Sequence, residues 1–273
     1  MILPLEDGCG DILSKAQKGL GISTETLAER TGVSESMIRS MRKGDYDSEA
    51  AARLAAALQL KPQALQAIAE GRWRPEEPAE LTGFAHFSTP FHDWQVNAFL
   101  VWDEATRAAV AFDTGTDASP MVETLERKGL KLQALFLTHA HRDHVAGIPA
   151  LRAKREFPIY LSASEPGGPR GGTRIGAGET KRFGGLSIEG FETPGHTEGG
   201  MSFRVGGLGR GIAIVGDALF AGSMGGTSIE AYERGIDSLQ RILELPEQTR
   251  LAPGHGPLTT VAEELRMNCF YRG

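Results

Sequence analysis

The sequence predicts an α/β protein of the α+β type, with a small all-helical domain at residues 1–72 and a larger mixed domain at residues 83–273. The first part of the chain carries only helical patterns, in which capping residues precede apolar positions. After it, segments with the two-residue period of strands alternate with helical patterns. Residues 73–82 contain two prolines and an acidic pair, which is typical of a linker.

The helical domain is expected to hold five helices. Ser23 and Ser34 suit N-cap positions, and Pro62 suits the first turn of the last helix. The expected helices span residues 11–17, 23–30, 34–43, 48–60 and 62–69. Residues 27–40 resemble the helix-turn-helix of Cro/repressor-type domains. That resemblance implies DNA binding by the second helix of the motif, through Ser34, Ser36, Arg39, Arg42 and Lys43.

Charge gives little support to DNA binding. The first 72 residues hold nine Lys or Arg and ten Asp or Glu, so their net charge is about −1. Phosphate neutralisation supplies much of the affinity for DNA, and a near-neutral domain offers little of it. The helical domain could instead act as a dimerisation or packing element. The dimerisation role would make the protein a homodimer.

The larger domain is expected to alternate strands with helices. The expected strands span residues 84–88, 96–102, 108–112, 135–137, 158–162, 186–191, 201–205 and 212–215. The expected helices span residues 119–128 and 145–154. Residues 164–185 are rich in Gly and Pro, and we expect a loop there.

The most informative stretch is Thr138-His-Ala-His-Arg-Asp-His144, which directly follows an apolar strand end. Side chains two residues apart in extended backbone point the same way, so His139 and His141 can converge on one point. Asp143 and His144 lie past the turn and must point to a neighbouring position. Four such groups crowded together favour a divalent metal site over a polar loop that is His-rich by chance.

Three further residues extend this pattern. His196 and His255 each lie in a Pro-Gly-His turn that follows an apolar or alternating segment. Asp217 ends the buried-strand pattern Ile212-Ala-Ile-Val-Gly. Because these residues add to the same kind of pattern at further strand ends, a metal site is a better interpretation than coincidence.

The content of these motifs and their order along the chain resemble those of the metallo-β-lactamase superfamily, over roughly residues 80–273. The resemblance implies a four-layer αββα sandwich with two metal ions at one edge. It implies that one metal is held by His139, His141 and His196, that the second is held by Asp143, His144 and His255, and that Asp217 bridges them. An aspartate bridge implies a thioesterase-like branch, with Asp143 and Asp217 as the catalytic carboxylates.

Two later segments resemble glyoxalase II-like enzymes (hydroxyacylglutathione hydrolases) of the short bacterial type. They are Asp217–Gly226 and Pro253–Phe270. The resemblance implies hydrolysis of a thioester. The glutathione-binding lysine of that family has no counterpart, because Ser223-Met-Gly-Gly226 stands in its place, so the thiol part of the substrate stays open.

The expected activity is metal-dependent hydrolysis. Two divalent ions about 3.5–4 Å apart can share a water whose pKa falls toward about 7, and the metal-bridging hydroxide then attacks the thioester carbonyl. Zinc is the expected metal, with iron or manganese as alternatives, since His/Asp sets accept all three. Three other functions stay open: a lactonase, a mononuclear iron persulfide dioxygenase, and a DNA-binding regulator whose sandwich domain senses a ligand.

Composition narrows the cellular setting. The net charge of −6 gives no overall basic field that would attract nucleic acid. Cys9 and Cys269 imply no disulfide framework, and the N-terminus lacks the apolar core of a signal peptide. No apolar run is long enough to span a membrane. We therefore expect a cytoplasmic protein that acts on a small thioester or ester.

Overall fold

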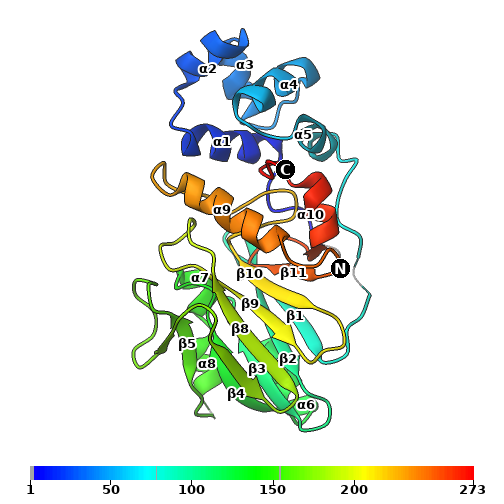
Figure 1. Ribbon diagram of the computed structural model, residues 1–273, viewed down its shortest axis with the longest axis vertical. Helices are drawn as coiled ribbons and strands as arrows, with labels where there is room; N and C mark the ends of the chain where they lie inside the picture. Colours follow the sequence, from blue (N-terminus) through cyan, green and yellow to red (C-terminus); the bar gives the residue numbers. More distant parts are fainter. Residues whose placement is uncertain (1–2, 78, 154) are drawn as a thin grey trace.

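The computed structural model describes residues 3–77, 79–153 and 155–273. Two six-stranded sheets lie face to face, and helices cover the outer face of each sheet (Figure 1). The predicted four-layer αββα sandwich is therefore confirmed. Among the described residues, no helix combines the length and the apolar character needed to cross a bilayer.

The first sheet has the strand order β1-β2-β3-β4-β5-β6. These strands are β1 (Phe84–Phe91), β2 (Trp94–Trp102), β3 (Ala108–Phe112), β4 (Lys131–Phe136), β5 (Ile159–Ser162) and β6 (Thr173–Ile175). The first three strands pair antiparallel, and β3 to β6 pair parallel. The helices after β3 and β4 are α6 (Ser119–Arg127), α7 (Arg142–Val145) and α8 (Ile148–Arg152). Met121 and Leu151 bury α6 and α8 against the outer face of this sheet.

The second sheet has the order β12-β11-β10-β9-β8-β7. Its strands are β7 (Thr180–Phe183), β8 (Leu186–Glu192), β9 (Met201–Gly206), β10 (Ile212–Gly216), β11 (Arg250–Pro253) and β12 (Thr259–Thr260). Within it, β10 and β11 pair parallel. The helices α9 (Tyr232–Leu243) and α10 (Val261–Met267) cover its outer face. Thr260 caps α10, because its Oγ1 accepts a hydrogen bond from the Glu263 amide and donates one to the Glu263 carboxylate.

Aromatic side chains fill the space between the sheets. Phe112, Phe136 and Phe203 come from three different strands and are at most 1% exposed. The rings of Phe136 and Phe203 meet edge to face with centroids 5.2 Å apart. Burial of each such side chain stabilises the fold by about 1.5–3 kcal/mol. This packing fixes the two sheets relative to each other, and with them the strand ends at their common edge.

The five predicted helices are present at the start of the chain. They are α1 (Cys9–Gly19), α2 (Thr24–Thr31), α3 (Glu35–Met41), α4 (Ser48–Ala57) and α5 (Pro62–Ala69), here called the helical unit. Ser23, Ser34 and Asp47 each accept a hydrogen bond from the first turn of the helix that follows. Gly32 ends α2 with a left-handed φ of 67°, a conformation that glycine adopts without strain.

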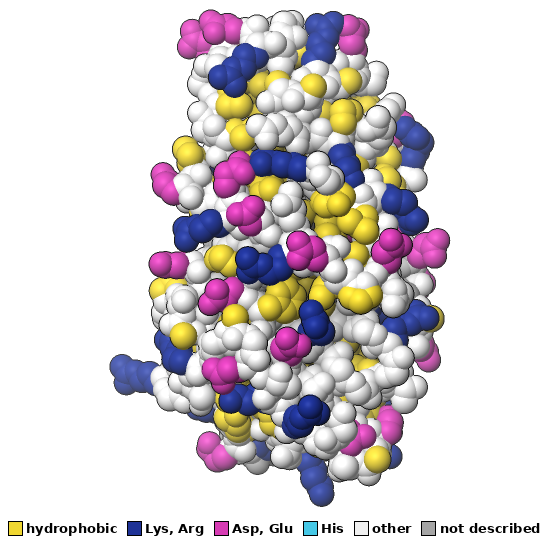
Figure 2. All heavy atoms as spheres, in the orientation of Figure 1, with side chains coloured by type: hydrophobic (Ala, Val, Ile, Leu, Met, Phe, Trp, Pro, Cys, Tyr) yellow, Lys and Arg dark blue, Asp and Glu magenta, His cyan; other side chains and the backbone are white. Residues whose placement is uncertain are grey.

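The helical unit packs against α9 and α10 (Figure 1). Leu13 and Leu65 of the unit share one buried cluster with Ile236 of α9 and Val261 of α10. Trp73, in the predicted linker, packs against the same cluster. On the face shown in Figure 2, basic and acidic side chains are interspersed, and neither sign dominates over the helical unit.

The structure corrects two details of the predicted secondary structure. The 164–185 stretch, predicted as a loop, contains two strands. β6 pairs with β5 at the edge of the first sheet, and β7 pairs with β8 at the edge of the second sheet. The predicted helix at 145–154 starts earlier, as α7, and continues after Gly147 as α8. Residue 154 lies outside the described residues.

Candidate metal centre

The seven predicted ligands lie in the segments that directly follow four strands, and two of them, Asp143 and His144, lie in the short helix α7. His139, His141, Asp143 and His144 follow β4, and His196 follows β8. Asp217 directly follows β10, and His255 follows β11. These segments gather at one edge of the sandwich, where both sheets present strand ends. The arrangement explains how residues more than a hundred positions apart meet.

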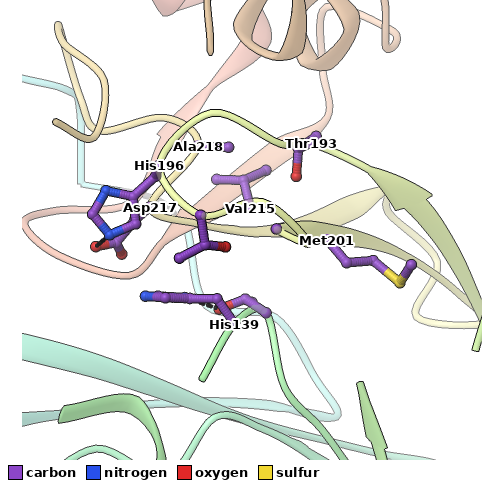
Figure 3. A pocket seen from close by; sticks show the side chains of 10 residues that line it. His139, Thr193, His196, Met201, Val215, Asp217 and Ala218 are labelled. Atoms are coloured by element: carbon purple, nitrogen blue, oxygen red, sulfur yellow. Dashed lines mark hydrogen bonds and ion pairs between the residues drawn. The ribbon is translucent and has the colours of Figure 1, made fainter. Parts of the chain in front are cut away.

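A small cavity of about 10 Å³ lies beside His139, His196 and Asp217 (Figure 3). Thr193 and Met201 also line it. This volume is close to the lower limit for a single water molecule, so the cavity is too small for a substrate. A substrate would have to approach from the other side, where His141 is exposed and His196 is half-buried.

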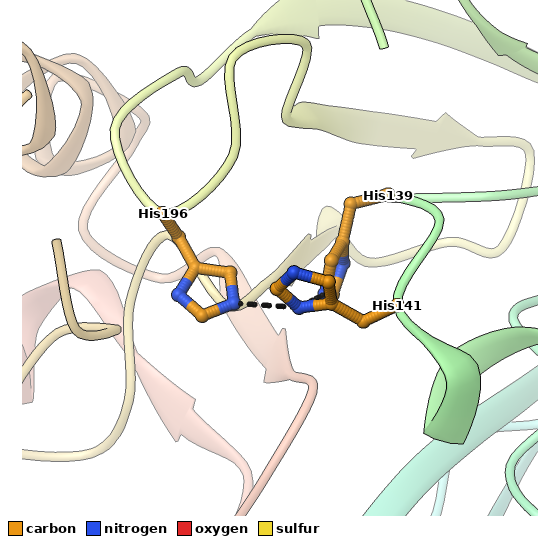
Figure 4. Close-up of side chains that lie close together, drawn as sticks. All are labelled: His139, His141 and His196. Carbon is orange, nitrogen blue, oxygen red and sulfur yellow. Dashed lines mark hydrogen bonds between the residues drawn. The ribbon is translucent and has the colours of Figure 1, made fainter. Parts of the chain in front are cut away.

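His139, His141 and His196 form what we call the first ligand group (Figure 4). Nδ1 of His141 lies 3.0 Å from Nε2 of His139 and 3.0 Å from Nε2 of His196. Two nitrogen ligands of one tetrahedral zinc ion, each about 2.0–2.1 Å from it, are roughly 3.3 Å apart. The spacing of these three nitrogens is therefore compatible with one shared cation.

Asp143, His144 and His255 form the second ligand group. Oδ2 of Asp143 lies 3.6 Å from Nε2 of His144 and 3.4 Å from Nε2 of His255. All three residues are buried. A carboxylate with two imidazole nitrogens at these separations is again a suitable donor set for a divalent cation.

Asp217 lies between the two groups. Its Oδ2 is 3.4 Å from Nε2 of His196, in the first group, and 3.5 Å from Nε2 of His255, in the second. Its Oδ1 is 3.4 Å from Nε2 of His144. The carboxylate is thus placed to contact cations held by either group.

Two buried atoms at this point lack a hydrogen bond. Within the described part of the chain, Oδ1 of Asp217 and Nε2 of His144 have no hydrogen-bond partner. An unpaired buried polar atom costs roughly 1–3 kcal/mol. A β-carbon at Gly254 would lie 2.1 Å from that same Oδ1, so only glycine leaves this space open. The residues therefore fit bound metal ions, which would satisfy both atoms.

Hydrogen bonds on the outer side of the rings fix which nitrogen faces the centre. The Nδ1 atoms of His196 and His255 lie 2.9 and 2.8 Å from the carbonyl oxygens of Gly226 and Gln95. A carbonyl can only accept, so each Nδ1 must carry the proton. With a metal bound, each ring would present the lone pair of Nε2 to the centre, as a metal ligand requires.

Burial and neighbouring positive charge act together in the first ligand group. Burial, with a further contribution from His144, holds the pKa of His139 well below its usual range. Burial and the neighbouring His196 also lower the pKa of His141. Both imidazoles are therefore neutral near pH 7 and available to bind a metal.

Carboxylates reverse this behaviour in the second ligand group. Burial alone would lower the pKa of His255, but Asp217 and Asp143 outweigh it and raise this pKa to about 11. Likewise, burial would lower the pKa of His144, but Asp217 and Asp113 raise it. Burial raises the pKa of Asp217, yet the charges of His144, His255 and His196 bring it well below its usual range.

Asp113 supports the second group. Its Oδ2 lies 2.9 Å from Nδ1 of His144, and its Oδ1 accepts a hydrogen bond of 2.8 Å from the Thr138 amide. The sequence placed Asp113 at the end of a strand but gave no reason to single it out. The parallel pairing of β3 with β4, which brings the two strand ends together, was the available signal.

Glu165 supports the first group. Its Oε1 accepts a hydrogen bond of 2.8 Å from the amide of Ala140, which lies between His139 and His141. Its Oε2 accepts one of 2.8 Å from the hydroxyl of Thr197, next to His196. The residue is 4% exposed. One carboxylate thus joins the two loops that carry this group, and no sequence motif marked it.

The remaining two histidines and the predicted DNA contacts belong to neither ligand group. His86 bonds to Asn97 at 2.8 Å, and Asn97 in turn holds the turn after β11 through the carbonyls of Pro253 and Gly256. His92 is exposed in the β1–β2 turn. The predicted DNA-contacting residues are exposed on and next to α3: Ser34, Ser36, Arg39, Arg42 and Lys43.

Comparison with known sequences places the chain in a family. The profile of the Metallo-beta-lactamase superfamily matches residues 93–255. The chain is 31% identical over 202 residues to the probable metallo-hydrolase YqgX of Bacillus subtilis, covering 66% of this chain and 93% of that protein. It is 30% identical to the hydroxyacylglutathione hydrolase GloC of Haemophilus influenzae, covering 66% of this chain and 95% of that protein. The chain therefore belongs to the metallo-β-lactamase superfamily.

Solved structures agree with this assignment. ETHE1 from Myxococcus xanthus superposes with a TM-score of 0.59 at 28% identity, over 67% of this chain and 83% of that one. TTHA1623 in a di-iron-bound form superposes with a TM-score of 0.55 at 29% identity, over 67% of this chain and 98% of that one. The predicted family is confirmed, whereas the helix-turn-helix resemblance of the helical unit stays a prediction.

Proposed function

We propose that this protein is a dinuclear metal-dependent hydrolase that cleaves thioesters, as glyoxalase II-like enzymes do. The observation that carries the proposal is the meeting of seven donor side chains in two groups joined by Asp217. Similarity to proteins named hydroxyacylglutathione hydrolases supports thioesters as the substrate class.

In this proposal, each ligand group holds one metal ion and Asp217 contacts both. When bound, the two ions would polarise the substrate carbonyl and supply a water acidic enough to ionise near neutral pH. Zinc is the proposed metal, since imidazole and carboxylate donors suit it. Iron is the main alternative, which the di-iron form of TTHA1623 supports, and the ligand set also accepts manganese.

The protein side chains have distinct tasks. Asp143 and Asp217 would neutralise part of the charge of the cations. The Nδ1 hydrogen bonds of His196 and His255 would hold their rings in place while substrate and product exchange. Neither cysteine is available as a nucleophile, because burial raises the pKa of the Cys9 thiol to about 11 and also raises that of Cys269.

The alternatives within enzymes differ in metal count and substrate. A mononuclear iron persulfide dioxygenase would use the first group alone, leaving Asp143 and His255 without a role at the centre. A lactonase would use the same centre on a cyclic ester. The number of metal ions per chain and the preferred substrate separate these functions from the proposed one.

The proposal is tested by a hydrolysis screen on zinc-loaded protein with S-lactoylglutathione, S-lactoyl-N-acetylcysteamine, lactones and phosphoesters. We expect thioesters to give the highest kcat/KM, and we expect chelation to remove at least 99% of it, with recovery on adding metal. Full activity after complete metal removal, or turnover of lactones alone, would contradict the proposal.

DNA binding by the helical unit is a second, weaker proposal. Its support is the exposure of Ser34, Ser36, Arg39, Arg42 and Lys43 on and next to α3. Two of these cations already have partners, since Arg39 pairs with Glu35 at 2.8 Å and Arg42 donates to Ser14 at 3.1 Å. A gel-shift assay at low salt is the test, and binding that does not fall after Arg39→Ala and Lys43→Ala would contradict it.

A further inference from the structure

The segment that precedes α1 lies against the metal centre. A β-carbon at Gly256, next to His255, would lie 3.1 Å from the Glu6 amide nitrogen and 3.6 Å from the Pro4 carbonyl oxygen. The backbone of residues 4–6 therefore packs directly on the turn that carries a candidate ligand. The start of the chain forms part of the wall of this site.

Asp7 and Lys15 attach this wall to the loop after Asp217. Asp7 is 6% exposed and accepts hydrogen bonds from Lys15 at 2.6 Å and from the hydroxyl of Ser223. Lys15 also donates to the carbonyl of Met224 at 2.9 Å. Its ammonium group lies 4.7 Å from the ring centroid of Phe220. Because Lys15 is fully engaged, it is not free to bind an anionic substrate.

Close packing holds the rest of the helical unit in place. A β-carbon at Gly19 of α1 would lie 2.0 Å from the Tyr232 ring of α9. One at Gly222 would lie 2.7 Å from Ile68 and 2.8 Å from Trp73. Lys61 donates to the carbonyl of Leu265 at the end of α10. These contacts leave little freedom for the unit to move away from the metal centre.

Glu6 is the second acidic residue of this wall. It is half-buried, and its β-carbon would lie 3.3 Å from a β-carbon placed on Gly256, next to His255. Burial raises the pKa of its carboxyl to about 6, and the charge of His255 opposes this rise. It belongs to neither ligand group. Within the described residues, it accepts no hydrogen bond and forms no ion pair, whereas the neighbouring Asp7 is neutralised by Lys15. A carboxylate next to a candidate metal ligand, with no hydrogen-bond partner in the protein, can act on the charge of a ligand bound at the centre.

We propose that Glu6 is a specificity-determining residue of the metal centre, which selects substrates with a positively charged leaving group over anionic ones. The inference rests on the proposed metal-dependent hydrolase function. It gives the segment before the helical unit a role at the metal centre that is independent of DNA. It also argues against glutathione, whose thioesters carry carboxylates, as the preferred thiol.

The test uses two small thiols of opposite charge, thiocholine and 2-mercaptoethanesulfonate, as probes of zinc-loaded protein. Calorimetry measures the Kd of each for the unmodified protein, Glu6→Gln and Glu6→Lys. Glu29→Gln, which removes an exposed charge from α2, is the matched control. We expect the unmodified protein and the control to prefer thiocholine. The ratio of the two Kd values should shift on the order of five-fold in Glu6→Gln and reverse in Glu6→Lys.

Equal ratios in all four proteins would overturn the role of Glu6, and so would a zinc-loaded protein that binds neither thiol. Turnover of the neutral thioester S-lactoyl-N-acetylcysteamine, measured on the same preparations, tests the proposed function separately. A charge preference without turnover would contradict the thioesterase proposal but support the role of Glu6. Turnover without a charge preference would support the thioesterase proposal but contradict the role of Glu6. Thermal melting of each variant shows whether the fold is retained.

Discussion

The first ligand group consists of three imidazoles, whereas the second combines two imidazoles with Asp143 and has Asp113 behind it. In the first group, burial and neighbouring histidines lower the pKa of His139 and His141. In the second, carboxylates raise the pKa of His144 and His255. His139 and His141 are thus neutral near pH 7, whereas His255 is protonated. The metal-free protein is ready to bind a cation in the first group but must release protons in the second.

Asp217→Asn should have the largest effect, because this carboxylate contacts both groups. We expect turnover of a thioester to fall on the order of a thousandfold and metal content to fall below two ions per chain. Kinetics and elemental analysis of the purified variant measure both. A variant with two bound ions and near-normal turnover would remove Asp217 from its bridging role.

Glu165→Gln and Asp113→Asn form a matched pair that separates the two groups. Glu165→Gln should weaken metal binding about 10- to 100-fold in the first group, because Glu165 joins the two loops of that group. Asp113→Asn should weaken metal binding by a similar factor in the second group, because Asp113 bonds to the His144 ring. Competition titrations with a metal indicator give the two affinities. If each variant weakened both groups equally, or the opposite group, the assignment of these supports would be wrong.

The pH dependence of metal binding should differ between the groups. The pKa of His255 in the folded, metal-free protein is raised to about 11, so this ring is protonated at pH 7 and a metal must displace its proton. Affinity in the second group should therefore rise with pH, about tenfold per unit for each displaced proton, until the pH approaches that pKa. The pKa values of His139 and His141 are lowered from 6.5, so the first group should show little change above pH 6.5.

Calorimetry in buffers of different ionisation enthalpy measures the protons released by each metal ion. Release of about one proton or more for the second ion, and almost none for the first, is the expected result. Equal release for both ions would mean that the two groups do not differ in protonation as described.

The meeting of the seven candidate ligands could be predicted because each follows a strand end. Short sequence patterns mark these residues as candidate ligands. The patterns are the His139–His144 stretch and the two Pro-Gly-His turns, and the fold then brings them together. The helices of the helical unit were equally predictable, because local capping residues such as Ser23 and Ser34 set their starts. What these residues share is that nearby sequence determines their structure.

The supporting residues could not be predicted in this way. Glu165 lies in a Gly-rich stretch and bonds to loops 25 and 32 positions away. Glu6 meets the site only because the helical unit packs on α9 and α10. The β6 and β7 strands were missed because they are short and glycine-rich segments surround them. Such contacts depend on tertiary packing, which periodicity and motif spacing do not encode.

The central claim is that two cations, held by two ligand groups, are needed for hydrolysis. It is tested most directly by adding zinc stepwise to metal-free protein while measuring bound metal and thioester turnover together. We predict that two ions bind per chain and that full turnover requires the second. Full turnover with one bound ion, or with none, would contradict the account.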